Sequence, residues 1–450
     1  MDFSGKKILV FGTGISGIAA AKLLLHRQAK VILFDGNKEL DRSRVLAEFQ
    51  GMPKISLYTG ELPETIAAEL DLVVVSPGVP TDLPLICDFK RAQIPVWGEV
   101  ELAYRCSKGM LLAITGTNGK TTTTALLGEI MKNAADNVRV VGNIGIPYAG
   151  VVEGMTDETV TVAEISSFQL ETVDSFCPRV SAILNITPDH LNRHHTMENY
   201  IAAKLNIAGN QSQDDYCVLN YEDEILRERA VDIRAKIIYF SSLRKLDRGL
   251  YLDGNRIMCA ENGTETQIIC TDELNILGRH NYENVMAAAA MAMCVGVPLE
   301  TIRSTLRTFQ AVEHRIEFVA EKRGVRFYND SKGTNPDAAI KGIQAMDRPT
   351  CLSGGGYDKN SVYKDWIESF DGKVKVLVLI GQTREKIAAE AEACGFTDYV
   401  FADSLQEAVD LCYERAKIGD AVLLSPACAS WGMFPNYEVR GKMFKEMVHA

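Results

Sequence analysis

The sequence has little of several features that would assign it to a protein class at once. Its 11 cysteines are scattered and include no Cys-x-x-Cys pair, so we expect reduced thiols in a cytoplasm and not a disulfide framework. The longest weakly polar stretch, residues 285–297, falls short of the ~20 residues that a membrane-spanning helix requires. Residues 1–7 lead directly into a predicted strand, so we also expect no signal peptide.

Positive charge is scarce as well. Lys and Arg total 48 against 59 Asp and Glu, and the resulting net charge of −11 argues against a nucleic-acid surface. A hydrophobic fraction of 46% and a charged fraction of 24% are typical of a soluble globular protein. The length of 450 residues predicts about three domains, which we place at residues 1–99, 100–311 and 312–450.

The most informative motif lies in residues 110–124. An apolar run at 111–114 predicts a buried strand, two glycines predict a tight loop, and a helix is expected from Lys120 onward. Loop N–H groups and a helix N-terminus converge on phosphate, so we expect Lys120 to reach the phosphates of ATP and Thr121 to bind Mg²⁺. A chance turn is the alternative, because this loop is shorter than the usual P-loop. The predicted ATP-binding residues are Gly116, Thr117, Asn118, Gly119, Lys120, Thr121 and Thr122.

Residues 6–35 form a β-α-β pattern that contains Gly-x-Gly-x-x-Gly at 12–17 and an acid, Asp35, 18 residues after the last glycine. Alone, this fingerprint predicts an NAD(H) site. The geometry requires only a diphosphate on the helix N-terminus, and a UDP-sugar also carries one. A second loop, Ser76-Pro-Gly78-Val-Pro80, follows the apolar run 72–75, at the sheet edge where ligand-binding loops lie. A plain turn is the alternative for that loop.

Three residues are candidates for a metal site. Glu164 ends a predicted strand in an apolar run, where an unpaired carboxylate is costly to bury, so we expect Mg²⁺ as its partner; a salt-bridged glutamate is the alternative. His190 lies in a loop with two further histidines, and this loop is either a ligand source or simply polar. Lys204 lies on a helix between Ala203 and Leu205 and is either solvated or partly buried with a lowered pKa. A neutral lysine can add CO₂ to form a carbamate, although nothing in the spacing requires it.

The C-terminal third repeats the order of strand, glycine or serine loop, and helix. Its loops at 329–335, 354–359 and 425–431 carry cations and hydroxyls, which suit a small dicarboxylate. Just before this region, Asn281 and Asn284 lie on one face at a helix start, where they either meet a nucleotide or cap the helix. The whole chain therefore predicts an α/β protein with Rossmann-like first and third domains. Between them we expect a P-loop ATPase domain with a parallel sheet and a β-rich flank.

Together the motifs resemble those of the ATP-dependent Mur ligase family and the related folylpolyglutamate synthetases. In order they are Thr115-Gly-Thr-Asn-Gly-Lys-Thr-Thr122, Gly142-Asn143-Ile-Gly, Glu164-Ile-Ser-Ser-Phe-Gln169, Asn185-Ile-Thr-Pro-Asp-His190, Ala202-Ala-Lys204, Gly278-Arg-His-Asn281, His314-Arg315 and Asp330-Ser-Lys-Gly-Thr334-Asn335. The first glycine loop, the Asp330 loop and Ser425-Pro-Ala-Cys-Ala-Ser430 favour the member that adds D-glutamate. The Asp-Asn-Pro-Arg signature of the diaminopimelate-adding member is absent.

The resemblance implies an enzyme of peptidoglycan precursor synthesis that joins D-glutamate to UDP-N-acetylmuramoyl-L-alanine through an acyl phosphate, with ATP and two Mg²⁺ ions. It implies catalytic roles for Lys120, Glu164, His190 and Lys204, and metal ligation by Thr121, Glu164, His190 and Lys204 as a carbamate. It places the nucleotide on Asn281, Asn284, Arg315 and Asp330 besides the glycine loop. It places the UDP-sugar on Gly14, Ile15, Ser16, Asp35, Ser76, Gly78, Asn143, Gln169 and His190. It places D-glutamate on Lys332, Thr334, Lys359, Ser430 and Tyr437, although the family usually has Phe in place of Tyr437.

Three alternatives to this hypothesis remain. Residues 12–35 also fit a nicotinamide-dependent oxidoreductase, which would leave the ATP loop and Glu164 without a role. A regulatory P-loop NTPase would turn over nucleotide without a carboxylate acceptor. Another Mur ligase, or an enzyme similar to folylpolyglutamate synthetase, would use the same motifs on a different acceptor. We expect a monomer in the cytoplasm that binds small molecules and no nucleic acid.

Overall fold

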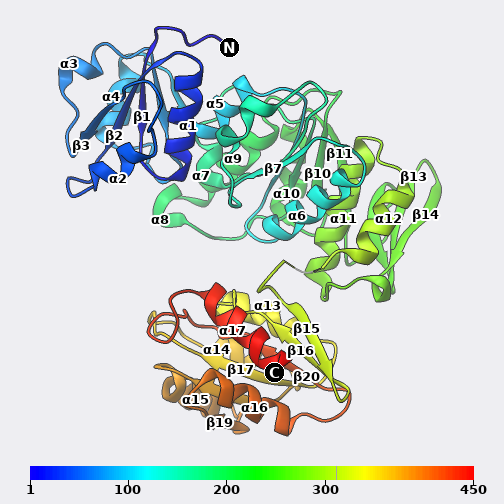
Figure 1. Cartoon of the computed structure of the whole chain (residues 1–450). Helices are drawn as coiled ribbons and strands as arrows, with labels where there is room; N and C mark the ends of the chain where they lie inside the picture. Colours follow the sequence, from blue (N-terminus) through cyan, green and yellow to red (C-terminus); the bar gives the residue numbers. More distant parts are fainter. Residues whose placement is uncertain (311) are drawn as a thin grey trace. The chain divides into compact units, whose positions relative to one another are not determined.

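The computed structural model describes residues 1–310 and 312–450 and contains three separate β-sheets (Figure 1). Backbone contacts group the chain into two compact units. Unit 1 comprises residues 1–269 and 283–305, and unit 2 comprises residues 270–282 and 306–450. The predicted α/β fold, rich in parallel strands, is confirmed. The predicted domain borders stay predictions, and the one at residue 311 lies outside the described residues.

The first sheet of unit 1 has five parallel strands in the order β3-β2-β1-β4-β5. Its strands are β1 (Lys7–Phe11), β2 (Lys30–Asp35), β3 (Ser56–Thr59), β4 (Leu72–Val75) and β5 (Val96–Gly98), and its helices are α1 (Ile15–His26), α2 (Arg42–Ala47), α3 (Glu64–Ala67) and α4 (Pro84–Arg91). Gly17 makes the tight β1–α1 turn possible, because a Cβ there would lie 1.9 Å from the carbonyl oxygen of Gly12. The predicted β-α-β unit is therefore confirmed.

The second sheet of unit 1 has nine strands in the order β14-β13-β12-β11-β10-β9-β6-β8-β7. The pairs from β7 to β12 are parallel, whereas β12 and β13 are antiparallel. The strands are β6 (Met110–Thr115), β7 (Val138–Gly142), β8 (Val160–Glu164), β9 (Val180–Ile183), β10 (Tyr216–Asn220), β11 (Lys236–Ser241), β12 (Gly249–Asp253), β13 (Arg256–Glu261) and β14 (Thr264–Cys270). The helices before and among them are α5 (Glu99–Cys106), α6 (Lys120–Lys132), α7 (Ser167–Leu170), α8 (Leu191–His194), α9 (Met197–Leu205), α10 (Glu224–Arg229), α11 (Arg279–Cys294) and α12 (Leu299–Thr308).

The first two sheets belong to one unit because they share a hydrophobic core. That core includes Ala20 and Leu24 of α1, Trp97 of β5, and Tyr148 and Ala149 of the short helix η1 (Tyr148–Gly150) that follows β7. Helix α1 thus packs against its own sheet on one side and against η1 on the other. Burial of this apolar surface, at about 25 cal/mol per Å², joins the two parts of unit 1.

The sheet of unit 2 has six strands in the order β15-β16-β20-β17-β18-β19 and is parallel except for the β15–β16 pair. Its strands are β15 (Glu317–Lys322), β16 (Val325–Asn329), β17 (Thr350–Gly355), β18 (Val374–Ile380), β19 (Tyr399–Phe401) and β20 (Ala421–Leu424). Helices α13 (Pro336–Gln344), α14 (Lys364–Glu368) and α15 (Arg384–Ala393) cover one face, whereas α16 (Leu405–Arg415) and α17 (Tyr437–His449) cover the other. Sheets covered on both faces by helices are typical of doubly wound folds. Throughout the described residues we find no helix with the length and apolar character needed to cross a membrane.

Candidate active site

The predicted ATP residues of unit 1 lie where neighbouring parallel strands of the second sheet end. Strands β7, β8, β6 and β9 are adjacent and run in the same direction, so their carboxyl ends meet at one edge. Loops at this edge are where α/β proteins bind ligands. Glu164 is the last residue of β8, and the glycine loop directly follows β6.

The glycine loop leads into α6 with the geometry of an anion site. Gly119, the residue before α6, has φ +85°, and a Cβ there would lie 2.3 Å from Oδ1 of Asn284. Glycine is therefore required by both the backbone and the available space. No side chain of the described residues caps the start of α6, and the N-terminus of a helix attracts anions.

Asn185, after β9, holds the glycine loop in place. The N–H of Asn118 donates to Asn185 Oδ1 at 2.8 Å, and Asn185 Nδ2 donates to the carbonyl oxygen of Asn118 at 3.1 Å. The N–H of Thr117 donates to the Asn185 carbonyl oxygen at 2.9 Å. The ammonium group of Lys120 lies over the loop, where it donates to the carbonyl oxygens of Gly116 at 2.9 Å and Thr117 at 3.0 Å. A fixed loop with a cation above it suits the phosphates of a nucleotide.

Four further predicted nucleotide residues belong to α6 and α11. Thr121 is half-buried and Thr122 is buried in the first turn of α6. One turn on, the Thr123 hydroxyl donates to Oδ1 of Asn284 at 3.2 Å, so Asn284 lies against α6 beside the loop. Asn281 falls in unit 2, where its Nδ2 donates to the carbonyl oxygen of Leu277 at 2.7 Å.

Glu164 has the surroundings expected of a cation ligand. Its side chain is 1% exposed, and Nδ2 of Asn143 donates to its Oε1 at 2.8 Å. The other oxygen, Oε2, has no hydrogen-bond partner among the described residues. A buried carboxylate oxygen without a partner carries a desolvation cost, and a bound cation would offset it. The residues present therefore fit Mg²⁺ at Glu164.

Lys204 is buried above the same loop. It is 1% exposed, and its Nζ lies 4.7 Å from the centre of the Tyr200 ring. The Tyr200 hydroxyl forms a hydrogen bond of 3.0 Å with the hydroxyl of Thr117. Burial, and then the charge of Lys120, lowers the pKa of Lys204 to about 7, whereas Asp189 acts in the opposite direction. A substantial fraction of Lys204 is therefore an uncharged amine near neutral pH, the form that reacts with CO₂.

His190 contacts other residues than those that surround Glu164. It adopts φ +53°, and its side chain is 51% exposed, with Nε2 3.5 Å from Oδ2 of Asp189. Its ring lies 4.9 Å from that of Phe168. Within residues 1–310 and 312–450, no three His, Cys, Asp or Glu side chains form a cluster that could hold a metal. Magnesium is usually held by one or two carboxylates, with water and substrate phosphates completing its coordination.

The predicted UDP-sugar residues of the first sheet surround the N-terminus of α1. Both oxygens of Asp35 are occupied: Oδ2 accepts from the N–H and hydroxyl of Thr13 at 3.1 and 2.7 Å, and Oδ1 accepts from the N–H of Asn37 at 3.0 Å. In NAD enzymes the corresponding acid binds the ribose hydroxyls, whereas here it holds the glycine loop. The Ser76 hydroxyl donates to the carbonyl oxygen of Gly12 at 3.4 Å, so the second loop lies beside the first.

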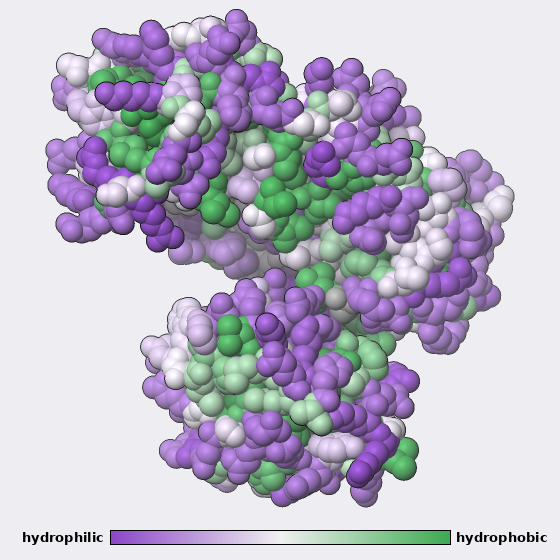
Figure 2. Space-filling model, in the orientation of Figure 1, coloured by the Kyte–Doolittle hydropathy of each residue, from purple (hydrophilic) through white to green (hydrophobic). Residues whose placement is uncertain are grey.

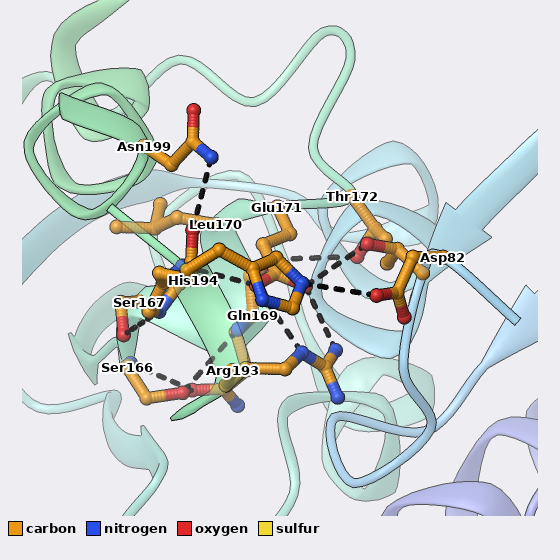
Figure 3. Close-up of polar contacts among 12 residues, drawn as sticks. Asp82, Ser166, Ser167, Gln169, Leu170, Glu171, Thr172, Arg193, His194 and Asn199 are labelled. Atoms are coloured by element: carbon orange, nitrogen blue, oxygen red, sulfur yellow. Dashed lines mark hydrogen bonds and ion pairs between the residues drawn. The ribbon is translucent and has the colours of Figure 1, made fainter. Parts of the chain in front are cut away.

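The other predicted UDP-sugar residues differ in exposure. Gly14, Ile15, Gly78 and Asn143 are exposed, and Ser16 is half-buried. Gln169 is only 5% exposed, and its Oε1 accepts from the N–H and the hydroxyl of Ser166 at 2.8 and 3.0 Å (Figure 3). This capping box fixes the start of α7. The Ser-x-x-Gln pattern could have revealed it from the sequence.

In unit 2, Asp330 and Arg315 are the predicted nucleotide residues. Asp330 is 4% exposed and accepts from the hydroxyl of Ser425 at 2.7 Å. Burial raises the pKa of Asp330 to about 7, whereas Ser425 and Arg315 act to lower it. Nε of Arg315 is buried and has no hydrogen-bond partner within the described part of the chain.

The predicted D-glutamate residues lie on loops that Arg440 holds together. Arg440 is fully buried and donates to the carbonyl oxygens of Ser331 at 2.8 Å and Cys428 at 3.3 Å. It thereby joins the loop after β16 to the loop after β20. Lys332 and Thr334 lie on the first loop and are half-buried, whereas Ser430 lies on the second and is buried.

Two lysines of this region lie over aromatic rings. Nζ of Lys332 is 5.7 Å from the ring of Tyr437, and Nζ of Lys359 is 4.8 Å from the ring of Trp431. Cations held near loops that carry hydroxyl groups suit an anionic ligand such as a dicarboxylate.

The roles of several residues in the site are not apparent from the sequence motifs. Asn185 belongs to one of these motifs, but its contact with the glycine loop crosses between two strands and leaves no local signal. Tyr200 lies four residues before Lys204 on α9, so the shared helix face could have indicated it. Arg440 lies in a polar helix, and its sequence neighbours do not reveal its burial.

Family models match most of the chain. The Mur ligase MurD-like N-terminal domain matches residues 6–98, the Mur ligase middle domain matches residues 114–292, and the Mur ligase glutamate ligase domain matches residues 314–428.

The chain belongs to the Mur ligase family.

The chain is similar over its full length to curated Mur ligases. It is 56% identical to the UDP-N-acetylmuramoylalanine–D-glutamate ligase of Lachnoclostridium phytofermentans, with 100% of this chain and 99% of that protein covered. It is 53% identical to the ligase of the same name from Lachnospira eligens, with both chains fully covered. The predictions of the family and of an ATP-dependent amide ligase are confirmed at this level, and an oxidoreductase is not supported.

Solved structures of the Mur ligase family share the fold. UDP-N-acetylmuramate-alanine ligase MurC from Thermotoga maritima aligns with a TM-score of 0.59 at 19% identity and covers 99% of both chains. MurF ligase from Thermotoga maritima, solved in complex with ADP, aligns with a TM-score of 0.57 at 16% identity over 100% of this chain and 96% of that one. The predicted three-part α/β architecture is thus confirmed. The individual site residues stay predictions.

Proposed function

We propose that this Mur ligase joins the amino group of D-glutamate to the alanyl carboxylate of UDP-N-acetylmuramoyl-L-alanine in peptidoglycan precursor synthesis, with ATP as the energy source. The names of its relatives support this substrate pair. The observation that carries the proposal is the edge of the second sheet, where the glycine loop with Lys120 and a buried carboxylate, Glu164, meet. Such an edge suits transfer of a phosphoryl group and has no evident use in hydride transfer.

The reaction needs an activated carboxylate, because a free carboxylate does not acylate an amine. A carboxylate oxygen of the acceptor attacks the γ-phosphorus of ATP, ADP leaves, and an acyl phosphate forms. The amine of D-glutamate then attacks the acyl carbon, phosphate leaves, and the nitrogen loses a proton. Lys120 and the N–H groups at the start of α6 would stabilise the charge that develops on the phosphoryl oxygens. Positioning of the two reactants can account for about 7–11 kcal/mol of the barrier.

Metal binding in this proposal uses Thr121, Glu164, His190 and Lys204, the last as a carbamate, with two Mg²⁺ ions. Bound there, Mg²⁺ would offset the negative charge of the phosphates. The partnerless Oε2 of Glu164 supports one ligand, and the lowered pKa of Lys204 supports carbamate formation because the uncharged amine reacts with CO₂. We also propose that the enzyme is a cytoplasmic monomer.

The UDP-sugar would lie on the loops of the first sheet and on those after β7 and β9. Exposed apolar side chains on or directly after these loops support this placement: Ile15, the first residue of α1, is 70% exposed, Ile146 is 53% exposed, and Leu191, the first residue of α8, is 39% exposed. Figure 2 shows apolar residues near β7, and further apolar areas over the first sheet and over unit 2. Exposed apolar patches commonly mark binding surfaces. D-glutamate would bind in unit 2 through Lys332, Thr334, Lys359, Ser430 and Tyr437, whose cations and hydroxyls suit its two carboxylates.

A substrate panel tests the proposal. We expect phosphate release only when ATP, UDP-N-acetylmuramoyl-L-alanine and D-glutamate are present together. L-glutamate in place of D-glutamate, or a folate in place of the UDP-sugar, should give only background release. Equal release with either substitute would refute the assignment. A change in NADH fluorescence on mixing with the protein would instead favour a nicotinamide-binding enzyme.

A further inference from the structure

A polar cluster in unit 1 links the first sheet to the second and has no role in the reaction described above. It consists of Glu171, Arg193 and His194 (Figure 3). The backbone of Val79 also belongs to it, through its contact with Arg193. We propose that Glu171 is a positioning residue that sets the UDP-sugar loop relative to the phosphoryl-transfer site. The inference rests on the proposed function, because it takes UDP-N-acetylmuramoyl-L-alanine as the ligand of that loop.

Glu171 is the hub of the cluster. It lies directly after α7, and its Oε2 accepts from Nη2 of Arg193 at 2.8 Å and from the Thr81 hydroxyl at 3.3 Å. Its Oε1 accepts from Nε of Arg193 at 3.4 Å and lies 3.2 Å from Nδ1 of His194. The side chains of Glu171 and Arg193 are each only 13% exposed. A two-pronged, largely buried pair between arginine and carboxylate fixes orientation as well as distance.

Arg193 carries this geometry to the predicted UDP-sugar loop. Its Nη2 donates to the carbonyl oxygen of Val79 at 2.9 Å, one residue after Gly78. Its guanidinium also lies 5.2 Å from the ring of Phe168 in α7. Arg193 can hold the loop only while its guanidinium group points toward the carbonyl oxygen of Val79, and the hydrogen bonds to Glu171 keep it in that orientation.

The same carboxylate also reaches the segments that carry the predicted metal ligands. His194, which contacts Glu171, forms a hydrogen bond of 2.9 Å with the Ser167 hydroxyl. Ser167 lies three residues after Glu164, and Arg193 lies three residues after His190. Glu171 therefore ties together the loop after β4, the exit of β8 and the segment after His190. A shift in this contact would move the acceptor relative to the phosphates.

A second pair of Arg and Glu residues offers a matched control. Nε of Arg27 donates to Oε1 of Glu153 at 3.0 Å and also joins the first part of unit 1 to the second. Arg27 directly follows α1, at the end of the helix opposite to Gly14, and the pair is more exposed, at 31% and 49%. If any ionic link between these parts were sufficient, both pairs would matter equally.

The test compares Glu171→Gln with Glu153→Gln in steady-state kinetics of the full chain. A lost charge-assisted pair typically changes an equilibrium about tenfold or more, so we expect Glu171→Gln to raise the KM for UDP-N-acetylmuramoyl-L-alanine by about tenfold. The KM for ATP should stay within about twofold, and Glu153→Gln should match the wild type. A purely structural defect would lower kcat through a smaller active fraction and leave every KM unchanged.

A double-mutant cycle with Arg193→Met completes the test. If the two residues act as one unit, the double variant should raise this KM no more than the worse single variant. Additive losses, or an unchanged KM in Glu171→Gln, would overturn the proposal. If Glu171→Gln fails to fold, Arg193→Lys can replace it in the test. Lysine keeps the positive charge but lacks the two-pronged guanidinium group, so this variant should also raise the KM for UDP-N-acetylmuramoyl-L-alanine and leave the KM for ATP unchanged. If the wild type releases phosphate with the three substrates but the variants do not show this change in KM, the positioning role is overturned and the proposed function is not.

Discussion

Replacement of Asp330 by asparagine tests whether burial controls the charge of this carboxyl group. The pKa of Asp330 is raised from 3.8 to about 7, chiefly by burial. Between these pH values the folded protein holds a proton that the unfolded chain has released, so the unfolding free energy falls as the pH rises. About 3 pKa units at about 1.4 kcal/mol each set a ceiling of about 4 kcal/mol on this loss. Asparagine cannot ionise, so the unfolding free energy of the variant should not show this loss as the pH rises.

Asparagine also suits the hydrogen bonds that Asp330 makes. Its Nδ2 can donate to the Ser425 hydroxyl, which now lies 2.7 Å from Oδ2 of Asp330, because a hydroxyl can reverse its role. We therefore expect Asp330→Asn and the wild type to be equally stable near pH 4. At pH 7.5 the variant should be the more stable by up to about 4 kcal/mol. Its KM for ATP should also rise, because Asp330 is one of the predicted nucleotide residues.

Urea unfolding followed by tryptophan fluorescence provides the assay. The chain has three tryptophans, of which Trp366 and Trp431 lie in unit 2 and Trp97 lies in unit 1. In a Trp97→Phe background the signal reports unit 2 alone, and Trp366 is fully buried in its core. A stability difference that does not change with pH would refute the reasoning. A wild type that is the more stable at pH 7.5 would show that the charges of Arg315 and Arg440 outweigh burial.

Two further substitutions test the loops of the site. Gly119→Ala should destabilise unit 1 by at least about 1–2 kcal/mol, because its left-handed backbone disfavours a Cβ, and should weaken ATP binding; calorimetry of nucleotide binding that shows no change would contradict this. Arg440→Met should destabilise unit 2 by about 1–3 kcal/mol, because the carbonyl oxygens of Ser331 and Cys428 would lose a buried donor. Urea unfolding in the Trp97→Phe background measures this loss, and a loss under about 1 kcal/mol would mean that water replaces the guanidinium.

The sequence allowed much of the fold to be predicted where patterns are local. The apolar run Leu72–Val75 is β4, residue for residue, and Lys120 is the first residue of α6, as expected. Both follow from short apolar runs that end at glycine or proline loops. The shared core of the first two sheets was not foreseen, because the second packing face of α1 meets η1, which is distant in the sequence.

The site was predictable in its residue types but not in its contacts. A glycine loop with Lys120 and a carboxylate at a strand end were visible as motifs. The sequence did not show that the Thr13 hydroxyl would donate a hydrogen bond to Asp35, because the two residues are 22 positions apart. Nor did it show that Arg193 and Glu171 would pair across 22 residues. Such contacts depend on how helices and loops pack, which no local period encodes.

Phosphorylation of the acceptor carboxylate is the central claim, and isotope transfer measures it most directly. The acceptor UDP-N-acetylmuramoyl-L-alanine would be labelled with oxygen-18 in its alanyl carboxylate and turned over with ATP and D-glutamate. If an acyl phosphate forms, one labelled oxygen should leave with each phosphate released, as mass spectrometry of the phosphate would show. Amide product accompanied by unlabelled phosphate would contradict the account.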